Sequence, residues 1–264
     1  MIDRGGLIKY YSQFIDEEGL FIKTLDLIIS ADQKYTAEVT PFLTPDLRML
    51  FTRIIKSQTE LELMTFSVFE ASERAKLAFW PPYTEPVLME NHVALLEVTF
   101  NQKFNELSHR DVLGALMALG IKRSSIGDIV AFEGGFQIAV DVSLKDYFLQ
   151  NIEKIGRAGV NVRTCPFEDK KEPVIDKKMC SGTVKSIRLD SIVALAFSLS
   201  RTEAQQLVES ERVKVNYVIT DKCGHEPVAG DLISVRGHGR LVLEEILGTT
   251  KKDRIRITLS VFSK

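Results

Sequence analysis

The stretch SRTEAQQLVESERVKVNYVI, residues 200–219, contains two structural signals within twenty residues. Ser200 followed by Glu203 is the pattern of a capping box, in which the serine caps an amide of the first helical turn and the glutamate reaches back to the serine amide. A helix is therefore predicted to begin directly after Ser200. Further along, Val213 and Val215 alternate with polar residues, which is typical of a strand with one buried face.

An arginine at the first position of this helix indicates an anion site. Backbone amides at a helix N-terminus carry partial positive charge and bind phosphate readily, and Arg201 lies in that turn. The alternative is that Arg201 pairs with Asp190, in a preceding helix predicted over 188–199. In the strand, Lys214 and Asn216 point away from the valines, so this face either contacts RNA or is only solvated.

The residues downstream extend the basic pattern. A Gly-Asp pair at 230–231 predicts a turn, and LISVRGHGRL at 232–241 predicts a returning strand. Within that strand Arg236, His238 and Arg240 would share one side, separated by glycines that leave the backbone bare. A cationic ladder of this kind suits a phosphodiester chain.

Together these motifs resemble the S4 RNA-binding domain. Its pattern is present as R-L-D at 188–190, S-R-x-x-A-Q at 200–205, V-K-V-N at 213–216, G-D at 230–231 and R-G-H-G-R at 236–240. The resemblance implies two helices and a β-hairpin that bind structured RNA, typically ribosomal RNA, through the start of the second helix and the hairpin face. The RNA-binding residues that it implies are Arg188, Ser200, Arg201, Gln205, Lys214, Asn216, Arg236, His238 and Arg240.

The resemblance extends over most of the chain to the YlmH family of bacterial S4 proteins, which are associated with ribosomes and encoded near cell-division genes. It is carried by EASERAK at 70–76, HRDVLGALMALGIKRSSIGDI at 109–129 and LGTTKKDRIRI at 247–257. Two positions depart from the family pattern: Glu211 replaces the usual glycine after the second S4 helix, and EASERAK replaces a GAERK run. If Glu211 is left-handed, the non-glycine residue costs on the order of 1 kcal/mol.

The whole chain is predicted to be an α+β protein with four segments. Residues 1–85 combine helices with short strands, and residues 86–168 form a ferredoxin-like βαββαβ domain. Residues 169–182 are polar and without an apolar period, so we expect a linker. Residues 183–264 form the S4 domain with a C-terminal strand extension.

The middle domain offers a second candidate RNA surface. His109 and Arg110 begin its first predicted helix, and Lys122 and Arg123 lie in the basic loop after it. Ferredoxin-like sheets are common RNA-binding platforms, and a solvated helix rim is the equally weighted alternative. The second helix of this domain is predicted over 143–156, capped by its first serine.

Composition sets further limits on function. The chain has 264 residues, 45% of them hydrophobic, and a formal net charge of −2, which fits a globular protein and not a general polyanion binder. Three widely spaced cysteines fit neither a disulfide framework nor a zinc site, so we expect no metal and no cofactor. No signal peptide and no membrane span is recognisable, so we expect a cytoplasmic protein.

The motifs of enzymes that carry S4 modules are absent. The sequence lacks the catalytic aspartate motif of pseudouridine synthases, the HIGH- and KMSKS-like motifs of tyrosyl-tRNA synthetases and a methyltransferase glycine loop, and its HRD at 109–111 lacks the rest of a kinase signature. We therefore expect no catalytic residues.

The resemblance instead implies a non-enzymatic protein that binds rRNA of the large ribosomal subunit, with tRNA as a further candidate, and that acts on stalled translation complexes. Two alternatives stay open: a protein-interaction factor in cell division, and an RNA-modifying enzyme with a buried carboxylate beside the S4 face.

Overall fold

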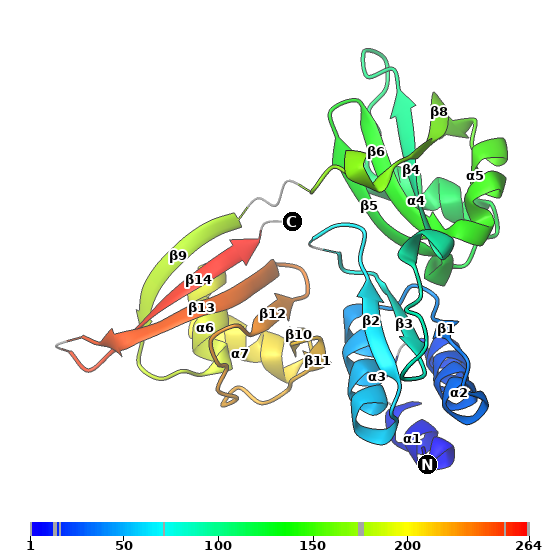
Figure 1. The fold of residues 1–264 in the computed structure, drawn as a ribbon. Helices are drawn as coiled ribbons and strands as arrows, with labels where there is room; N and C mark the ends of the chain where they lie inside the picture. The colour runs from blue at the N-terminus through cyan, green and yellow to red at the C-terminus, as the bar shows by residue number, and fades with distance from the viewer. Residues whose placement is uncertain are drawn as a thin grey trace. The chain divides into compact units, whose positions relative to one another are not determined.

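The structure, a computed structural model, describes residues 2–12, 15, 17–70, 72–173, 177–250 and 252–262. Contacts divide the chain into two compact units, Met1–Pro173 and Val174–Lys264. Each unit contains helices packed on antiparallel sheets (Figure 1). The mixed α+β class predicted from the sequence is therefore confirmed.

Unit 1 begins with three helices and a small sheet. The helices are α1 (Arg4–Tyr11), α2 (Glu18–Lys34) and α3 (Pro45–Gln58), and the sheet pairs β1 (Glu38–Val39), β3 (Lys76–Trp80) and β2 (Glu62–Phe66) in that order. Phe21 of α2 and Phe51 of α3 stack with ring centroids 5.4 Å apart. They share a core with Leu77 and Phe79 of β3, so the helices cover one face of this sheet.

The ferredoxin-like domain follows in the same unit. Its elements are β4 (Val93–Phe100), α4 (His109–Ala118), β5 (Ile126–Phe132), β6 (Gly135–Asp141), α5 (Lys145–Asn151), β7 (Lys154–Ile155) and β8 (Ala158–Cys165). Short 3-10 helices lie at Met89–Asn91, Arg123–Ser125, Val142–Leu144 and Phe167–Asp169. The sheet is antiparallel with the order β5-β6-β4-β8-β7, which contains the predicted βαββαβ succession with one added edge strand.

The predicted second helix of this domain is too long. Its cap is Leu144 instead of Ser143, because the Ser143 hydroxyl already donates to Asp141 Oδ1 at 2.6 Å inside a 3-10 turn. The helix ends at Asn151, and the chain then turns at Gly156, whose φ of +58° is in the left-handed region, to form the β7–β8 hairpin.

Both faces of the ferredoxin-like sheet are covered. One face packs against α4 and α5 through residues such as Val112 and Phe148. The other face packs against the N-terminal sheet, in a second core that includes Leu95 of β4 and Trp80 of β3. Trp80 is 3% exposed and its Nε1 donates to Glu62 Oε2 at 3.0 Å. The open sheet on which many ferredoxin-like domains bind RNA is thus largely occupied by the protein itself.

Unit 2 is a six-stranded sheet with two helices on one face. Its elements are β9 (Lys177–Val184), α6 (Leu189–Phe197), α7 (Arg201–Glu209), β10 (Val213–Val215), β11 (Val218–Ile219), β12 (Leu232–Val235), β13 (Gly239–Thr249) and β14 (Ile255–Phe262). The antiparallel strand order is β11-β10-β12-β13-β14-β9. Leucine, isoleucine and valine side chains from α6, α7 and every strand except β11 form one core.

Two local predictions in unit 2 are wrong. Residues 177–182 of the expected linker belong to β9, which pairs along its whole length with β14; an edge strand fixed by backbone hydrogen bonds needs no strong apolar period. The single strand predicted over 232–241 is instead a hairpin, in which Val235 pairs with Gly239 across a short turn. Gly237 and Gly239 have φ of +96° and +133°, and this left-handed backbone closes the turn.

The end of α7 is a Schellman motif with an unfavourable residue. The amide of Arg212 donates to Leu207 O and that of Glu211 to Val208 O, both at 3.0 Å, and Glu211 has φ of +58°. Only glycine adopts this conformation without steric cost. The departure of Glu211 from the S4 pattern therefore imposes a real backbone strain.

Replacing Glu211 by glycine should stabilise unit 2. Relief of left-handed strain exceeds the added entropy of the unfolded chain, so the free energy of unfolding should rise by about 0.5–1 kcal/mol. Native-state hydrogen exchange of the core amides in α7 and β10 measures this change. Glu209→Gly, the same substitution inside the helix, is the matched control and should destabilise; equal effects of the two variants would contradict the assignment.

Candidate nucleic-acid interface

The junction of α6 and α7 brings the start of the second helix to the surface. Ser198 ends α6 in a left-handed conformation with φ of +54°, and α7 begins only three residues later, at Arg201. The predicted capping box is present: Ser200 Oγ accepts from the amide of Glu203 at 3.2 Å, and the Glu203 carboxylate accepts from the amide of Ser200 at 2.8 Å. This sharp junction presents the first turn of α7, with Arg201 in it, to solvent.

The buried carboxylate of Asp190 organises the basic residues at this junction. Asp190 is 0% exposed and accepts from Arg188 Nε and Nη2 at 3.1 and 3.2 Å, from Gln205 Nε2 at 3.2 Å and from Arg201 Nε at 3.4 Å. The side chains of Arg188 and Arg201 remain 34% and 57% exposed. One carboxylate thus fixes three predicted RNA-binding residues side by side, with both guanidinium groups still accessible from solvent.

This arrangement bears on the alternative left open by the sequence, in which Arg201 only pairs with Asp190. The ion pair between Arg201 and Asp190 is formed, but it uses Nε and leaves more than half of the arginine side chain exposed. Burial alone would raise the pKa of Asp190, yet the hydrogen bonds from Arg188 and Gln205 and the charges of both arginines outweigh it, so its pKa is lowered. Asp190 is therefore an ionised anchor.

The remaining predicted residues do not form the ladder expected along one strand. Arg236 and His238 are exposed in the turn between β12 and β13, where the His238 ring lies 5.7 Å from that of Phe197 in α6. The turn is therefore beside the α6–α7 junction. Lys214 and Arg240 do not lie beside this junction. The residues next to them in their strands, such as Val215 and Leu241, point into the core under the helices, and side chains alternate between the two faces of a sheet. Lys214 pairs with Ser234 and Ser234 with Arg240, so both basic residues lie on the opposite sheet face.

Asn216 has a structural role that the sequence analysis missed. It has φ of +47° and begins the tight turn between β10 and β11. Its Nδ2 donates to Asp231 Oδ1 at 2.7 Å, and its Oδ1 accepts from the amide of Leu232 at 3.0 Å. The signal was available, since asparagine is one of the few residues that tolerate the left-handed region.

Three of the four residues predicted for the second RNA surface are exposed, and the fourth has a structural role. His109 and Arg110 are exposed at the start of α4, and Lys122 is exposed after it. Arg123, however, donates from Nη1 to Ile126 O at 2.5 Å and to Gly127 O at 3.1 Å. Burial and the charge of Arg74 lower its pKa to about 10. Arg123 therefore holds the backbone of unit 1 together and is poorly placed for a phosphate, whereas the other three remain candidates.

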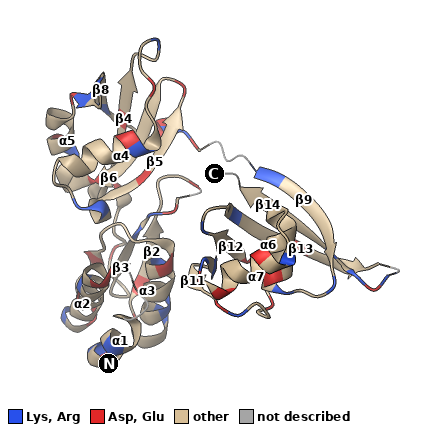
Figure 2. Cartoon of the chain, turned by 180° about the vertical axis from the view of Figure 1, so that it is seen from behind, with Lys and Arg blue, Asp and Glu red and all other residues tan. Residues whose placement is uncertain are grey.

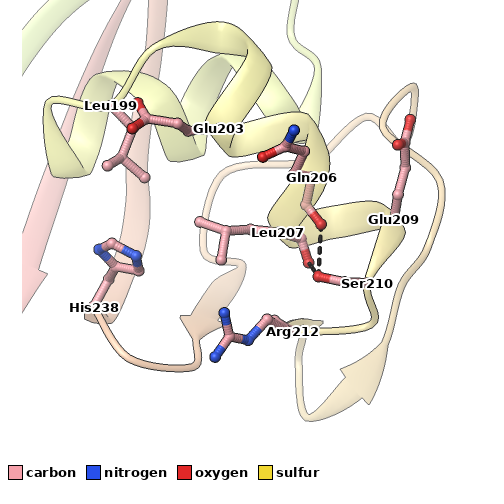
Figure 3. A pocket seen from close by; sticks show the side chains of 8 residues that line it. All are labelled: Leu199, Glu203, Gln206, Leu207, Glu209, Ser210, Arg212 and His238. Carbon is pink, nitrogen blue, oxygen red and sulfur yellow. Dashed lines mark hydrogen bonds between the residues drawn. The ribbon is translucent and has the colours of Figure 1, made fainter.

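A surface cavity of about 620 Å³ lies between α7 and the turn at 236–238. Its lining residues are Leu199, Glu203, Gln206, Leu207, Glu209, Ser210, Arg212 and His238 (Figure 3). Of these lining residues, His238 alone was predicted from the sequence to bind RNA. The spacing of the lining residues along α7, three to four residues apart, is the one signal that could have revealed a second functional face of this helix.

Charge is mixed over the surface of both units. Figure 2 shows acidic and basic residues together on α4 and α7, whereas Asp190 is the one charged residue within α6. Among the described residues there is no cluster of three or more histidine, cysteine, aspartate or glutamate side chains that could hold a metal ion. None of the helices in the described ranges has the length and apolar character needed to cross a lipid bilayer.

Comparison with known proteins identifies the family. The family model described as "Putative RNA-binding domain in YlmH" matches residues 86–169, and the S4 domain model matches residues 187–233. The "Ribosome-associated protein quality control protein P2" of Bacillus subtilis (strain 168) is 31% identical over 249 residues, which are 94% of this chain and 96% of the relative. The chain belongs to the YlmH family of S4-domain RNA-binding proteins.

A solved structure of the same family agrees with this assignment. "Cell division protein ylmH from Streptococcus pneumoniae" is 28% identical and superposes with a TM-score of 0.51, over 60% of this chain and 96% of that chain. Within the YlmH-family chain described here, the S4 match includes α6, α7 and β10, and therefore the Asp190 cluster. The long β13–β14 ribbon and β9 extend beyond it.

Replacing Asp190 by asparagine should loosen the α6–α7 junction. The variant loses charge-assisted hydrogen bonds to two arginines, so hydrogen exchange of α7 amides at neutral pH should indicate a loss of about 2 kcal/mol. Because the folded pKa of Asp190 is lowered, this contribution is fully present above about pH 4 and disappears as pH falls through the folded value. A difference between wild type and variant that stays constant down to the acid limit would contradict the anchoring role.

Proposed function

We propose that this protein binds structured RNA of the ribosome through the first turn of α7 and the adjacent turn at 236–238, without catalysing a reaction. The observation that carries the proposal is the Asp190 cluster, which holds two partly exposed guanidinium groups in fixed positions. Such groups bind phosphate oxygens with little further loss of side-chain entropy. Arg236 and His238 add cationic or donor groups from the neighbouring turn.

The large ribosomal subunit is the proposed location of this RNA. Support comes from the Bacillus subtilis relative, which is named as a ribosome-associated quality control protein and matches nearly the whole chain. We extend the proposal to stalled translation complexes, in which rRNA and tRNA both present folded phosphate backbones. We also infer a cytoplasmic location, because ribosomes act in the cytoplasm.

The Asp190 geometry favours binding over RNA modification. A modifying enzyme would need a carboxylate that contacts the substrate, whereas Asp190 is fully buried and engaged by Arg188, Arg201 and Gln205. Both matching family models describe RNA-binding domains. A structural role for this carboxylate accounts for every contact that it makes.

Co-sedimentation with ribosomal subunits tests the proposal. The full chain should pellet with large subunits, and digestion of the exposed rRNA with nuclease should release it. Sedimentation with small subunits alone would overturn the large-subunit assignment. Crosslinking in cells with sequencing of the attached RNA then identifies the bound helix.

A second candidate function is a protein contact in cell division. The observation that favours it is the name of the Streptococcus pneumoniae structure, a cell division protein. In that case the chain would bind a protein partner through the same S4 face, and nuclease treatment would leave its sedimentation unchanged. The same experiment therefore separates the two functions.

Binding should depend steeply on salt. With about three phosphate contacts, from Arg188, Arg201 and Arg236, log K against log salt concentration should fall with a slope of about −3. Filter binding of a structured rRNA fragment over a range of potassium chloride concentrations measures this slope. A nearly flat dependence would rule out an interface led by phosphates.

Alanine at Arg201 and Arg236 should each weaken binding by a similar factor for RNAs of different sequence, because phosphate contacts carry no base code. Each variant should also reduce the magnitude of the salt slope by about one. Arg53→Ala, at an exposed position of α3, is the matched control and should bind as the wild type does. Loss of affinity for one sequence only would indicate base recognition instead.

A further inference from the structure

The cavity between α7 and the turn at 236–238 adjoins the proposed phosphate-binding residues but is built differently. Leu207, 8% exposed, forms an apolar floor together with Leu199. Figure 3 shows the Leu207 side chain in the middle of the labelled residues, with Glu203 and Gln206 on one side and His238 and Arg212 on the other. The volume of about 620 Å³ is within the range of about 300–1,000 Å³ that small-ligand sites occupy.

The charges that line the cavity disfavour a phosphate group inside it. Glu203 and Glu209 contribute two carboxylates, against one guanidinium from Arg212 and the imidazole of His238. An anion would meet like charge within the cavity, whereas an uncharged group with polar edges would not. The Gln206 amide offers a donor and an acceptor, and the carboxylates offer acceptors for amino groups.

An aromatic ring lies at the edge of the cavity. The His238 ring is exposed and is supported by Phe197 of α6, with centroids 5.7 Å apart and an interplanar angle of 47°. The backbone of the turn is fixed as well, because the Arg236 amide donates to Arg212 O at 2.8 Å. A planar ring held in this way is a stacking partner for a base.

We propose that this cavity receives one unpaired nucleobase of the bound RNA, which stacks on His238, covers Leu199 and Leu207, and hydrogen-bonds to Gln206. The inference rests on the proposed function, since Arg201 and Arg236 lie two residues along the chain from Glu203 and His238, which line the cavity. The protein should therefore prefer RNA in which an unpaired base lies next to the phosphates that contact Arg201 and Arg236, as in bulges and loops. Phosphate contacts alone give no such preference.

A pair of RNA hairpins tests this assignment on the full chain. One hairpin carries a single bulged adenosine, and the other has an abasic residue at the same place. The wild type should bind the adenosine bulge about tenfold more tightly, which corresponds to stacking of one base. The ratio should be independent of salt, since the base is uncharged, while each individual affinity falls with salt.

Variants locate the base in this cavity. Gln206→Ala and His238→Ala should each reduce the ratio toward one, and His238→Phe, which keeps a stacking ring but no charge, should preserve it. Gln33→Ala, an exposed glutamine of helix α2, is the matched control and should retain the wild-type ratio. A ratio that persists in both alanine variants would place the base elsewhere and overturn the assignment.

The outcomes also separate this inference from the proposed function. Equal, salt-dependent binding of both hairpins would overturn the base site and leave the phosphate interface standing. Failure of the chain to bind either hairpin or any rRNA fragment would overturn the proposed function itself. Leucine-methyl NMR with adenosine and with ribose 5-phosphate gives a further readout: shifts at Leu199 and Leu207 with the nucleoside alone support the assignment, and equal shifts with the sugar phosphate contradict it.

Discussion

The surface chemistry of unit 2 depends on one buried carboxylate. Asp190 cannot be left unpaired in a core, because an ionised and unsatisfied carboxylate costs several kcal/mol. It accepts hydrogen bonds from Arg188, which precedes α6, and from Arg201 and Gln205 of α7. These bonds hold the three side chains close together. The same contacts join the two helices and orient the groups proposed to bind RNA. Fold stability and the proposed RNA binding therefore depend on a single set of hydrogen bonds.

The fixed positions of Arg188 and Arg201 explain how a chain with a net charge of −2 can serve as an RNA-binding protein. A strongly basic surface would attract any polyanion, with an affinity governed by charge number. Here α7 carries both acidic and basic residues and α6 carries only Asp190, so attraction of a polyanion to these helices at long range is weak. We propose that recognition then depends on the few positions at which guanidinium groups are preorganised, and that it selects for the shape of the partner.

Local signals were sufficient for much of the fold. The capping box at Ser200 and Glu203 lies within four residues and was predicted correctly, as was the alternation that buries Val213 and Val215. The βαββαβ order followed from helix and strand periods alone. The errors concern features that depend on contacts which sequence patterns do not reveal. β9 is a strand because β14 pairs with it, and the Arg123 guanidinium donates to a carbonyl group of its own unit.

Three of the residues around Asp190 could be named from the sequence, but their geometry could not. The S4 pattern named Arg188, Arg201 and Gln205, yet nothing in the sequence stated that one aspartate would hold all three. The glycines at 237 and 239 were interpreted as bare backbone for a ligand, whereas they close a turn that separates His238 from Arg240. Two glycines separated by one residue are ambiguous in this way, because a strand and a turn both tolerate them.

The double coverage of the ferredoxin-like sheet has a practical consequence for anyone who dissects the protein. The boundaries of the YlmH model at residues 86–169 enclose a recognisable sequence module, but they cut through a shared core. A fragment cut at these boundaries would lack Trp80 and Phe66, which pack in the same core as Leu95, and would expose a sheet face that is buried in the intact chain. The module that the family model matches is thus smaller than the compact unit that contains it, and soluble fragments should be sought by cutting after Pro173 instead.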